Sequence, residues 1–517
     1  MKPLEKNVTI MRYLIHLAVV FLCTTSQLIY CEKFVVFVAQ SKSHIYPILS
    51  VARELEKDNH SVTFVLSDSM KATLLKEGVN VLSITAQSLD TYDIVEKVGA
   101  VLESKANGGK LSAFLNLLKA AYEQCHYFMV DTDLYTKLRS EKFDYAIVDY
   151  AHILCFEVMA YKLSLPFVYI GAHIDLAMYR TPFFPSFMPA FFSGFTDKMT
   201  FMERVMNVIL HMIHLSKPSM PTFDNVVDKY APERPYLTNQ QLRRNALLHI
   251  IDGDVLMDYP VAIPPNIVLC GGLSASDAKP LPSNIQTFAE SSNGIVIVSF
   301  GSIFKSIPQE VFNKLIGSFQ EVKQFKFIFR YGNTETLTEN VLLLPWLPQN
   351  DLLGHPKTKL FITHCGKSGL FEALYHGVPM IGFPMGMDQV PNAAVVVDKG
   401  YGISMDFKSF TTEDLVENIK NVSFSKDYRK NIQKASEIFH SRPQKPPRRA
   451  AYWIDLVIRY GPRHFRPASM DMPWYAFYML DVFLFFVIVI VLSMSVLLFV
   501  CKSLCRCCKK QRRQKLD

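Results

Sequence analysis

The sequence predicts two α/β domains with parallel sheets that face each other across a cleft, followed by one membrane-spanning helix. Apolar, strand-like runs alternate with helical patterns through both halves of the chain, which is typical of parallel sheets covered by helices. The 517 residues exceed what one core normally holds, because single cores rarely grow beyond about 250–300 residues. Residues 482–501 contain no charged side chain and are long enough to cross about 30 Å of hydrocarbon as a helix.

The first domain is expected over residues 32–277. It opens with the run Phe34-Val35-Val36-Phe37-Val38, and a helical pattern follows near residues 46–57. Short β-branched and aromatic runs of this kind indicate buried strands. The strands expected in this domain cover residues 34–38, 62–66, 81–85, 144–149 and 167–170.

The proline-bearing segment over residues 278–284 is the expected linker to a second domain over residues 285–445. Residues 446–481 are expected to form a C-terminal helix and a juxtamembrane segment, directly before the span at 482–501. The strands expected in the second domain cover residues 294–300, 325–329, 360–363 and 380–383, and its clearest helix covers 309–322.

The two ends of the chain predict its topology. A basic segment ending at Arg12, an apolar run and small polar residues before Cys31 indicate a signal peptide over residues 1–31. The tail over residues 502–517 has seven basic residues against one acidic residue. This tail is expected in the cytosol, so that residues 32–481 lie on the luminal side. Because the net charge of +8 is concentrated at the ends, it gives no argument for nucleic-acid binding.

The strand at residues 360–363 leads into a glycine-rich turn, His364-Cys365-Gly366-Lys367-Ser368-Gly369, and then a helix that carries Glu372 one turn in. The backbone N–H groups and the positive end of such a helix suit a diphosphate. Taken alone, the turn also fits an ordinary strand-to-helix connection in which the glycines only ease packing.

Trp346 and Gln349 precede this turn, and the pair Asp388-Gln389 follows it. The whole spaced set resembles the signature of the UDP-glycosyltransferase superfamily, whose animal branch includes the UDP-glucuronosyltransferases. Residues 197–205 and 453–455 also look like that branch. The resemblance implies two Rossmann-like domains of the GT-B type, the first binding an acceptor and the second a UDP-sugar.

The resemblance also implies a role for each residue of the set. Trp346 would stack on uracil, Gln349 would contact the nucleoside, and Glu372 would bind the ribose hydroxyls. Asp388 and Gln389 would bind hydroxyls of the sugar. An indole face, a carboxylate and a pair with mixed acceptors and donors suit these partners. The residues that the resemblance assigns to the phosphates are Ser302, His364, Gly366, Ser368 and Gly369.

His44 is the candidate general base for the acceptor hydroxyl. It follows the first strand and begins the first helix, whose positive end is expected to keep the ring neutral. Asp149 ends the strand at residues 144–149 and could hold His44 in the required tautomer. The superfamily's catalytic His–Asp pair matches these two positions in context. The alternatives are a solvated loop histidine and an aspartate that caps a helix.

The chain departs from the animal family at two places. The family usually has H-G-G-x-N-G at the turn, whereas here Ser368 replaces the asparagine. Gly386 stands where family members often have an aromatic residue, so the sugar remains open. A glucuronate carboxylate needs a cationic partner in the cleft, and Arg330 is a candidate.

No metal and no cofactor are expected, with the UDP-sugar acting as a co-substrate. Two D-x-D sequences, at residues 131–133 and 252–254, formally match metal-dependent glycosyltransferases. Both lie in the first domain, away from the nucleotide signature, and neither follows a convincing strand. No P-loop and no G-x-G-x-x-G sequence occurs.

Ten cysteines are too few for a disulfide scaffold in a chain of this length. No C-x-x-C pair occurs among the luminal cysteines, so neither a zinc site nor a redox motif is indicated. The cysteines at the membrane edge of the C-terminal tail are palmitoylation candidates or free thiols. Asn59 and Asn421 lie in N-x-S sequences and are glycosylation candidates. The luminal cysteines are Cys125, Cys155, Cys270 and Cys365.

Residues 181–192 contain five phenylalanines and three prolines. Such a segment could cap an apolar acceptor pocket or lie on the membrane, and ordinary loop packing is the alternative.

Together these features predict an endoplasmic reticulum enzyme that transfers a hexose from a UDP-sugar to a small lipophilic acceptor with inversion. Glucuronic acid is the favoured sugar, on the resemblance alone. The alternatives are a UDP-glucose or UDP-galactose transferase and a catalytically silent partner subunit of the same fold. Arg513 and Lys515 resemble a dilysine retrieval signal in which arginine replaces one lysine. The acceptor and the oligomeric state are left open.

Overall fold

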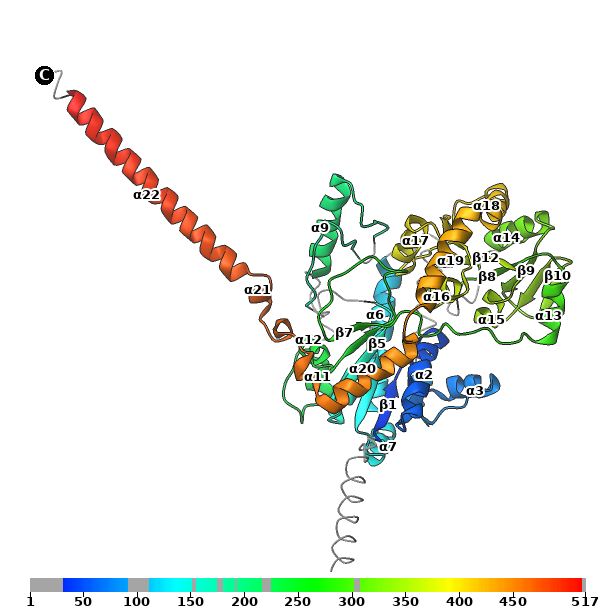
Figure 1. The fold of residues 1–517 in the computed structure, drawn as a ribbon. Helices are drawn as coiled ribbons and strands as arrows, with labels where there is room; N and C mark the ends of the chain where they lie inside the picture. The colour runs from blue at the N-terminus through cyan, green and yellow to red at the C-terminus, as the bar shows by residue number, and fades with distance from the viewer. Residues whose placement is uncertain are drawn as a thin grey trace, which may run out of the picture.

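The computed structural model describes residues 31–91, 111–150, 155–173, 180–190, 193–215, 225–301 and 307–513. Two α/β domains lie side by side, and a long C-terminal helix extends away from them (Figure 1). Each domain contains a seven-stranded sheet, which confirms the predicted fold class. The predicted signal peptide, over residues 1–31, lies almost entirely outside the described residues.

The sheet of the N-terminal domain is parallel throughout, in the order β3-β2-β1-β4-β5-β6-β7. The strand order reverses between the neighbours β1 and β4, and ligands of open α/β sheets bind at such a reversal. Two strands of three residues each, β6 and β7, were not predicted. The strands are β1 (Lys33–Phe37), β2 (Ser61–Leu66), β3 (Ser83–Thr85), β4 (Tyr145–Asp149), β5 (Phe167–Gly171), β6 (His249–Ile251) and β7 (Ile267–Leu269).

Helices cover both faces of this sheet. The first helix begins at Lys42 rather than at the predicted residue 46, so His44 lies inside its first turn. A disulfide that the sequence analysis did not predict joins Cys125 of α6 to Cys155 at the start of α8, with 5.6 Å between the Cα atoms. The helices are α2 (Lys42–Lys57), α3 (Asp68–Lys76), α4 (Ser88–Thr91), α6 (Leu111–Val130), α7 (Thr132–Ser140), α8 (Phe156–Lys162), α9 (Phe201–Leu215), α11 (Val226–Tyr230) and α12 (Asn239–Arg244).

The sheet of the C-terminal domain has the order β10-β11-β9-β8-β12-β13-β14 and is parallel except for the β10–β11 pair. Its central strand β8 is buried at every residue, which explains the continuous apolar run. The strands are β8 (Ile295–Ser299), β9 (Lys326–Arg330), β10 (Glu335–Thr338), β11 (Val341–Leu344), β12 (Thr358–Thr363), β13 (Met380–Gly382) and β14 (Gly402–Ser404).

The helices of this domain begin at Ser283, inside the segment expected to be the linker. Gly377, with φ at 65°, ends α16 in the left-handed conformation that favours glycine. Asn59 and Asn421 are both exposed, and their glycosylation stays a prediction. The helices are α13 (Ser283–Glu290), α14 (Gln309–Glu321), α15 (Gln349–Leu353), α16 (Lys367–His376), α17 (Gln389–Asp398), α18 (Thr412–Phe424) and α19 (Lys426–His440).

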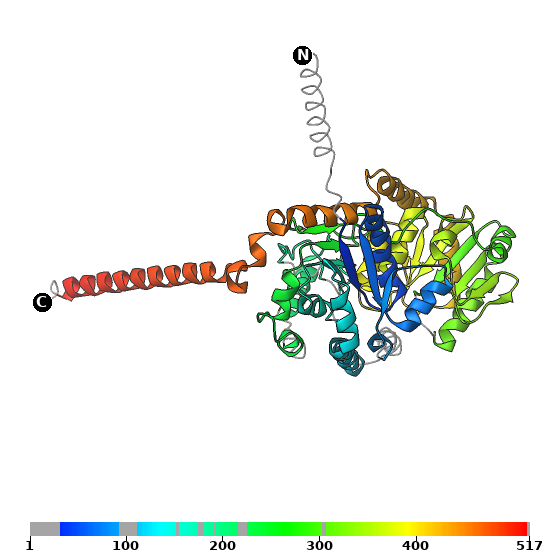
Figure 2. The ribbon, with the colours of Figure 1, turned by 90° about the horizontal axis from the view of Figure 1, so that it is seen from below.

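The chain then returns to the N-terminal domain. Helix α20 (Pro446–Tyr460) lies across this domain beside α2 (Figure 2), and His60 Nε2 lies 2.8 Å from Asp455 Oδ1. Two short 3₁₀ turns and α21 (Trp474–Phe477) lead into α22 (Leu480–Arg513). Within the described part of the chain, α22 is the one helix long and apolar enough to span a membrane, over Leu480–Arg506.

Candidate active site

A cleft of about 1030 Å³ lies between the two domains. The carboxyl ends of the strands of both sheets open onto it, which is where parallel α/β sheets bind ligands. Every predicted catalytic or donor-binding residue within the described part of the chain lines this cleft, and Ser302 lies outside that part. Residues predicted from distant parts of the sequence therefore share one cavity.

His44 and Asp149 form a pair on the N-terminal side of the cleft. His44 follows β1 and Asp149 ends β4, so the strand reversal places them next to each other. His44 Nδ1 lies 2.8 Å from Asp149 Oδ2 and 3.1 Å from Oδ1. The Asp149 side chain is 3% exposed, and its Oδ2 also accepts a hydrogen bond from the Ala39 backbone N–H at 3.0 Å. Burial and the Ala39 N–H therefore hold the Asp149 carboxylate in place, and the carboxylate in turn orients the imidazole of His44.

The pKa of His44 is shifted in the direction opposite to the sequence expectation. Burial lowers the pKa of His44, but the charge of Asp149, its hydrogen bond and the charge of Asp388 together raise the pKa above 6.5. The helix N-terminus was expected to keep the ring neutral, whereas the two carboxylates favour the protonated ring. Nε2 makes no hydrogen bond to any residue that the structure describes, so this nitrogen is open to the cleft.

The residues assigned to the nucleoside lie at one end of the C-terminal side. Trp346 is 39% exposed, and Lys42 of the N-terminal domain places Nζ 3.4 Å from the centre of its ring. Gln349 Nε2 donates a hydrogen bond to Glu372 Oε2 at 2.6 Å. Burial raises the pKa of Glu372 to about 7, with Gln349 opposing the shift.

The glycine-rich turn between β12 and α16 is shaped around the His364 ring. A Cβ atom on Gly301 or on Gly366 would lie 2.5 or 2.4 Å from His364 Nε2, so only glycine leaves room for the imidazole at either position. Burial lowers the pKa of His364 to about 4, which keeps the ring neutral at physiological pH. Ser368 and Gly369 follow in the first turn of α16, whose N-terminal N–H groups face the cleft.

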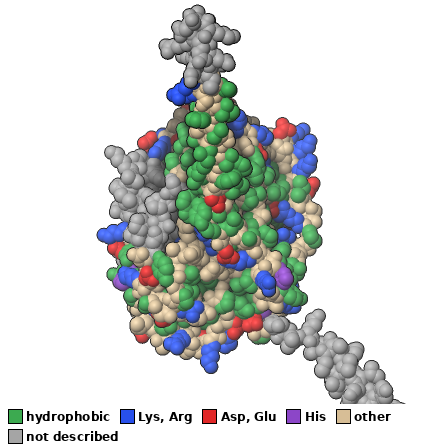
Figure 3. All heavy atoms as spheres, turned by 90° about the vertical axis from the view of Figure 1, so that its left-hand side faces the viewer, with side chains coloured by type: hydrophobic (Ala, Val, Ile, Leu, Met, Phe, Trp, Pro, Cys, Tyr) green, Lys and Arg blue, Asp and Glu red, His purple; other side chains and the backbone are tan. Residues whose placement is uncertain are grey.

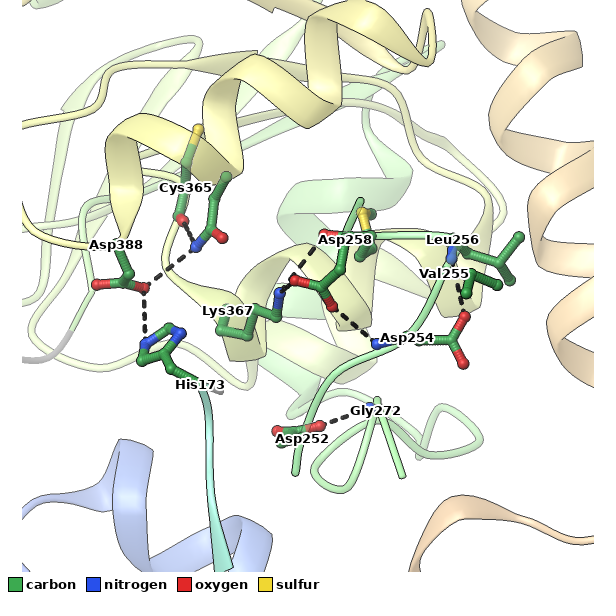
Figure 4. Close-up of polar contacts among 12 residues, drawn as sticks. His173, Asp252, Asp254, Val255, Leu256, Asp258, Gly272, Cys365, Lys367 and Asp388 are labelled. Carbon is green, nitrogen blue, oxygen red and sulfur yellow. Dashed lines mark hydrogen bonds and ion pairs between the residues drawn. The ribbon is translucent and has the colours of Figure 1, made fainter. Parts of the chain in front are cut away.

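Asp388 and Gln389 occupy the start of α17 and are held by their own neighbours. Gln389 Oε1 accepts a hydrogen bond from the Met385 backbone N–H at 2.8 Å. Asp388 Oδ2 accepts one from Asn392 Nδ2 at 3.1 Å, and His173 Nε2 lies 3.7 Å from the same oxygen (Figure 4). Burial raises the pKa of Asp388. Side chains of both domains therefore meet around this carboxylate.

Sequence reasoning missed two residues at this end of the cleft. His173 lies two residues beyond β5, and the rule that pointed to His44, a polar residue after a strand, could have found it. Burial and the charges of Lys367 and His44 lower the pKa of His173 to about 3. Lys367 is a buried ammonium that pairs with Asp258 and lies 3.4 Å from the Met257 carbonyl oxygen (Figure 4). The feature of the sequence that could have pointed to Lys367 is its charge, inside the glycine-rich turn.

Aspartates of both D-x-D sequences have partners within the protein. Asp131 caps α7 by accepting a hydrogen bond from Leu134 N at 2.9 Å. Asp252 accepts from Gly272 N at 2.6 Å and lines the cleft, and Asp254 pairs with Arg442. Asp252 directly follows β6, so the statement that neither sequence follows a strand was wrong. The three-residue length of β6 concealed it.

Gly386 and Arg330 are the two residues that the sequence analysis connected with the choice of sugar. Gly386 has φ at 149° and Met387 has φ at 55°, so an aromatic residue at position 386 would strain the backbone. Arg330 donates a hydrogen bond to the Gly301 carbonyl oxygen, and its guanidinium lies 5.5 Å from the centre of the Trp346 ring. Arg330 therefore lies beside the Trp346 ring, the residue assigned to the nucleoside.

Solved structures with low identity share this two-domain arrangement. A glycotransferase of kitacinnamycin aligns with a TM-score of 0.57 and 18% identity over 83% of this chain and 99% of that chain. A UDP-glucose: anthocyanidin 3-O-glucosyltransferase in complex with UDP aligns with a TM-score of 0.54 and 17% identity over 83% and 99%. The fold is therefore the GT-B fold of glycosyltransferases.

Sequence relatives cover almost the whole chain. UDP-glucuronosyltransferase 2C1 of Oryctolagus cuniculus is 32% identical over 92% of this chain and 96% of its own length. UDP-glucuronosyltransferase 2A3 of Homo sapiens is 32% identical over 94% and 95%. Residues 33–515 match the family model described as UDP-glucoronosyl and UDP-glucosyl transferase. The chain therefore belongs to this family and is a UDP-glycosyltransferase.

Proposed function

We propose that the protein transfers a hexose, with glucuronic acid favoured, from a UDP-sugar to the hydroxyl of a small lipophilic acceptor, with inversion at C1. One observation carries the mechanism: the His44–Asp149 pair faces the donor residues across a shared cleft. With Nδ1–H donating to Asp149, Nε2 takes the acceptor's hydroxyl proton. The acceptor oxygen then bonds to C1 as the bond from C1 to the diphosphate oxygen breaks. Attack from the side opposite the departing UDP inverts C1.

The departing diphosphate would be stabilised by the turn between β12 and α16. The N-terminal N–H groups of α16 and the hydroxyl of Ser368 are the donors in this proposal. His364, with its pKa lowered to about 4 by burial, would add a neutral N–H. These groups supply the role that a divalent cation plays in other glycosyltransferases, so the proposed reaction uses no metal.

Glucuronic acid requires a cation at the sugar end of the cleft, and Lys367 is the best placed one. Its ammonium is buried, and its charge lowers the pKa of His173 and acts on Asp388, the residue expected to bind the sugar. We therefore assign the carboxylate of the donor to Lys367, in place of Arg330. The two sequence relatives named above are both UDP-glucuronosyltransferases, which supports the same sugar.

A neutral hexose is the second candidate, because Lys367 already has a carboxylate partner in Asp258. UDP-glucose or UDP-galactose would leave that pair intact, whereas glucuronate would have to share the ammonium with it. A catalytically silent partner subunit is less well supported, since the His44–Asp149 pair is assembled in full.

We place the enzyme in the endoplasmic reticulum membrane, with both domains in the lumen and α22 as its span. The basic tail after the span supports this orientation. The disulfide between Cys125 and Cys155 suits an oxidising compartment.

The test is to offer labelled UDP-glucuronic acid, UDP-glucose and UDP-galactose to microsomes containing the full-length protein, with a panel of phenols and sterols as acceptors. We expect transfer from UDP-glucuronic acid at least tenfold above the other donors, in EDTA as well as without it. Microsomes with the His44→Ala protein are the matched control. Preference for a neutral sugar would contradict the donor assignment, and loss of activity in EDTA with recovery in manganese would contradict the metal-free reaction.

A further inference from the structure

Helix α9 turns its apolar side chains outward. Asn207 and His211 face the protein, with Asn207 0% and His211 4% exposed, whereas a surface helix normally buries its apolar stripe. The large side chains on the opposite side are exposed, up to 69% for Met202. This α9 face consists of Phe201, Met202, Val205, Met206, Val208, Ile209, Met212 and Ile213.

The inward polar residues fix this orientation. Asn207 Oδ1 accepts a hydrogen bond from Ala190 N at 2.7 Å, and its Nδ2 donates to the carbonyl oxygens of Pro185 and Met188, both at 2.8 Å. His211 Nε2 lies 3.2 Å from the same Met188 oxygen. Rotating the helix to bury its apolar side would break these bonds and leave buried polar groups unpaired. The outward face is therefore built into the fold.

The loop held by α9 extends the apolar surface and connects it to the membrane span. Phe184 and Phe187 of this loop are exposed and stack with their ring centres 5.7 Å apart. At its start, Arg180 donates to the Met472 carbonyl oxygen at 3.4 Å, and its guanidinium lies 4.8 Å from the centre of the Phe477 ring. Met472 and Phe477 belong to the segment that leads directly into α22.

The same side of the molecule carries the span. In Figure 1, α9 lies on the side from which α21 and α22 leave the N-terminal domain. Figure 3 faces this side, with α22 toward the viewer, and hydrophobic side chains extend from α22 onto the neighbouring surface. Trp474 and Tyr475 at the start of α21 are exposed, and such aromatic residues mark the interface between lipid and water.

We propose that the α9 face, together with Phe184 and Phe187, lies in the interface of the same bilayer that α22 spans. The face carries no charged side chain, as contact with acyl chains requires. Glu203 and Arg204, near the start of α9, bond to Thr200 N and to the Met199 carbonyl oxygen. The N-terminal domain thus contacts the membrane at two places, a span and a surface helix. A second copy of the chain is the alternative occupant of the face.

The experiment uses the full-length protein reconstituted in liposomes, with Cys31 and the tail cysteines replaced by serine. Met206→Cys carries an environment-sensitive fluorophore on the α9 face, and Ile209→Cys is a second site. Leu75→Cys, on the exposed surface of α3, is the matched control. Spin-labelled acyl chains in the lipid serve as quenchers. Donor transfer by each labelled protein reports that it is folded.

We expect quenching at positions 206 and 209 at least twofold greater than at position 75, with a blue-shifted emission at the first two. Equal quenching at all three positions would overturn the proposal. So would crosslinking of Met206→Cys between two copies, in liposomes at low protein density, with no quenching by lipid, because the face would then be covered by a second copy.

Discussion

The two sides of the cleft are assembled in different ways. On the N-terminal side, His44 and Asp149 are 105 residues apart and meet only because β1 and β4 are neighbours in the sheet. On the C-terminal side, Trp346, the glycine-rich turn and Asp388 lie within one stretch of the chain. The first side depends on topology and the second on local backbone geometry. We infer that the first side carries the proton transfer and the second the donor, so that changes on each should affect different measurements.

The largest effect is expected from His44→Ala. Removing the base should lower kcat by more than about 100-fold, while the dissociation constant of UDP stays within about twofold, because the nucleotide residues lie on the other side of the cleft. Single-turnover rates and calorimetric titration with UDP measure the two quantities separately. A normal rate in the folded variant would remove His44 from the mechanism. A large loss of UDP binding would show that the two sides are not separable.

Asp149→Asn should be nearly as damaging. Asp149 Oδ2 lies 2.8 Å from His44 Nδ1 and accepts a hydrogen bond from Ala39 N, so an asparagine oxygen at that position could still accept from both. The substitution nevertheless removes the negative charge that stabilises the imidazolium, and an amide NH2 group turned toward His44 would impose the wrong tautomer. A loss in kcat of about 100-fold is expected, and thermal unfolding of the variant separates the catalytic loss from a folding defect. Full activity in a stable variant would leave Asp149 a structural role only.

The pH profile of the same variant supplies a sharper test. The pKa of His44 is raised above 6.5 by Asp149, and the base works only when neutral. The rate in the native protein should therefore fall about tenfold per pH unit below a midpoint that lies above 6.5. Removing the carboxylate charge should move this midpoint to lower pH. An unchanged midpoint would mean that another group titrates.

The difference between the two sides also explains what the sequence could predict. The residues of the C-terminal side lie in one stretch with fixed spacing, so a motif could locate them. His44 and Asp149 were located because His44 follows a strand and Asp149 ends one, and both strands are long enough to recognise. Lys367 was visible as a charged residue in the turn, but its partner Asp258 lies 109 residues away, and their pairing depends on how the domains meet. The three-residue strands β6 and β7 are too short to show a periodicity.

Lys367→Met addresses the sugar end of the C-terminal side. Loss of the ammonium should reduce the preference for UDP-glucuronic acid over UDP-glucose by about tenfold, since a hydrogen bond to a charged group contributes about 1.5–3 kcal/mol. Competition between the two labelled donors measures the ratio. The double variant with Asp258→Asn tests whether an unpaired carboxylate, rather than the missing cation, causes the change. The control is Lys445→Met. Lys445 also lines the cleft and pairs with Asp277, and its removal should leave the preference between the two donors unchanged.

The smallest effect is expected from Lys42→Met, where the two sides touch. Lys42 belongs to the N-terminal domain, yet its ammonium lies over one face of the Trp346 ring. Uracil would have to displace this ammonium in order to stack on the same face. A cation over an aromatic ring contributes about 0.5–1 kcal/mol at exposed sites, so its removal should tighten UDP binding by no more than about fivefold and leave kcat unchanged. Trp346 fluorescence, titrated with UDP in the native and variant proteins, measures the affinity. Weaker binding in the variant would show instead that Lys42 contacts the diphosphate, and the N-terminal side would then contribute to holding the donor.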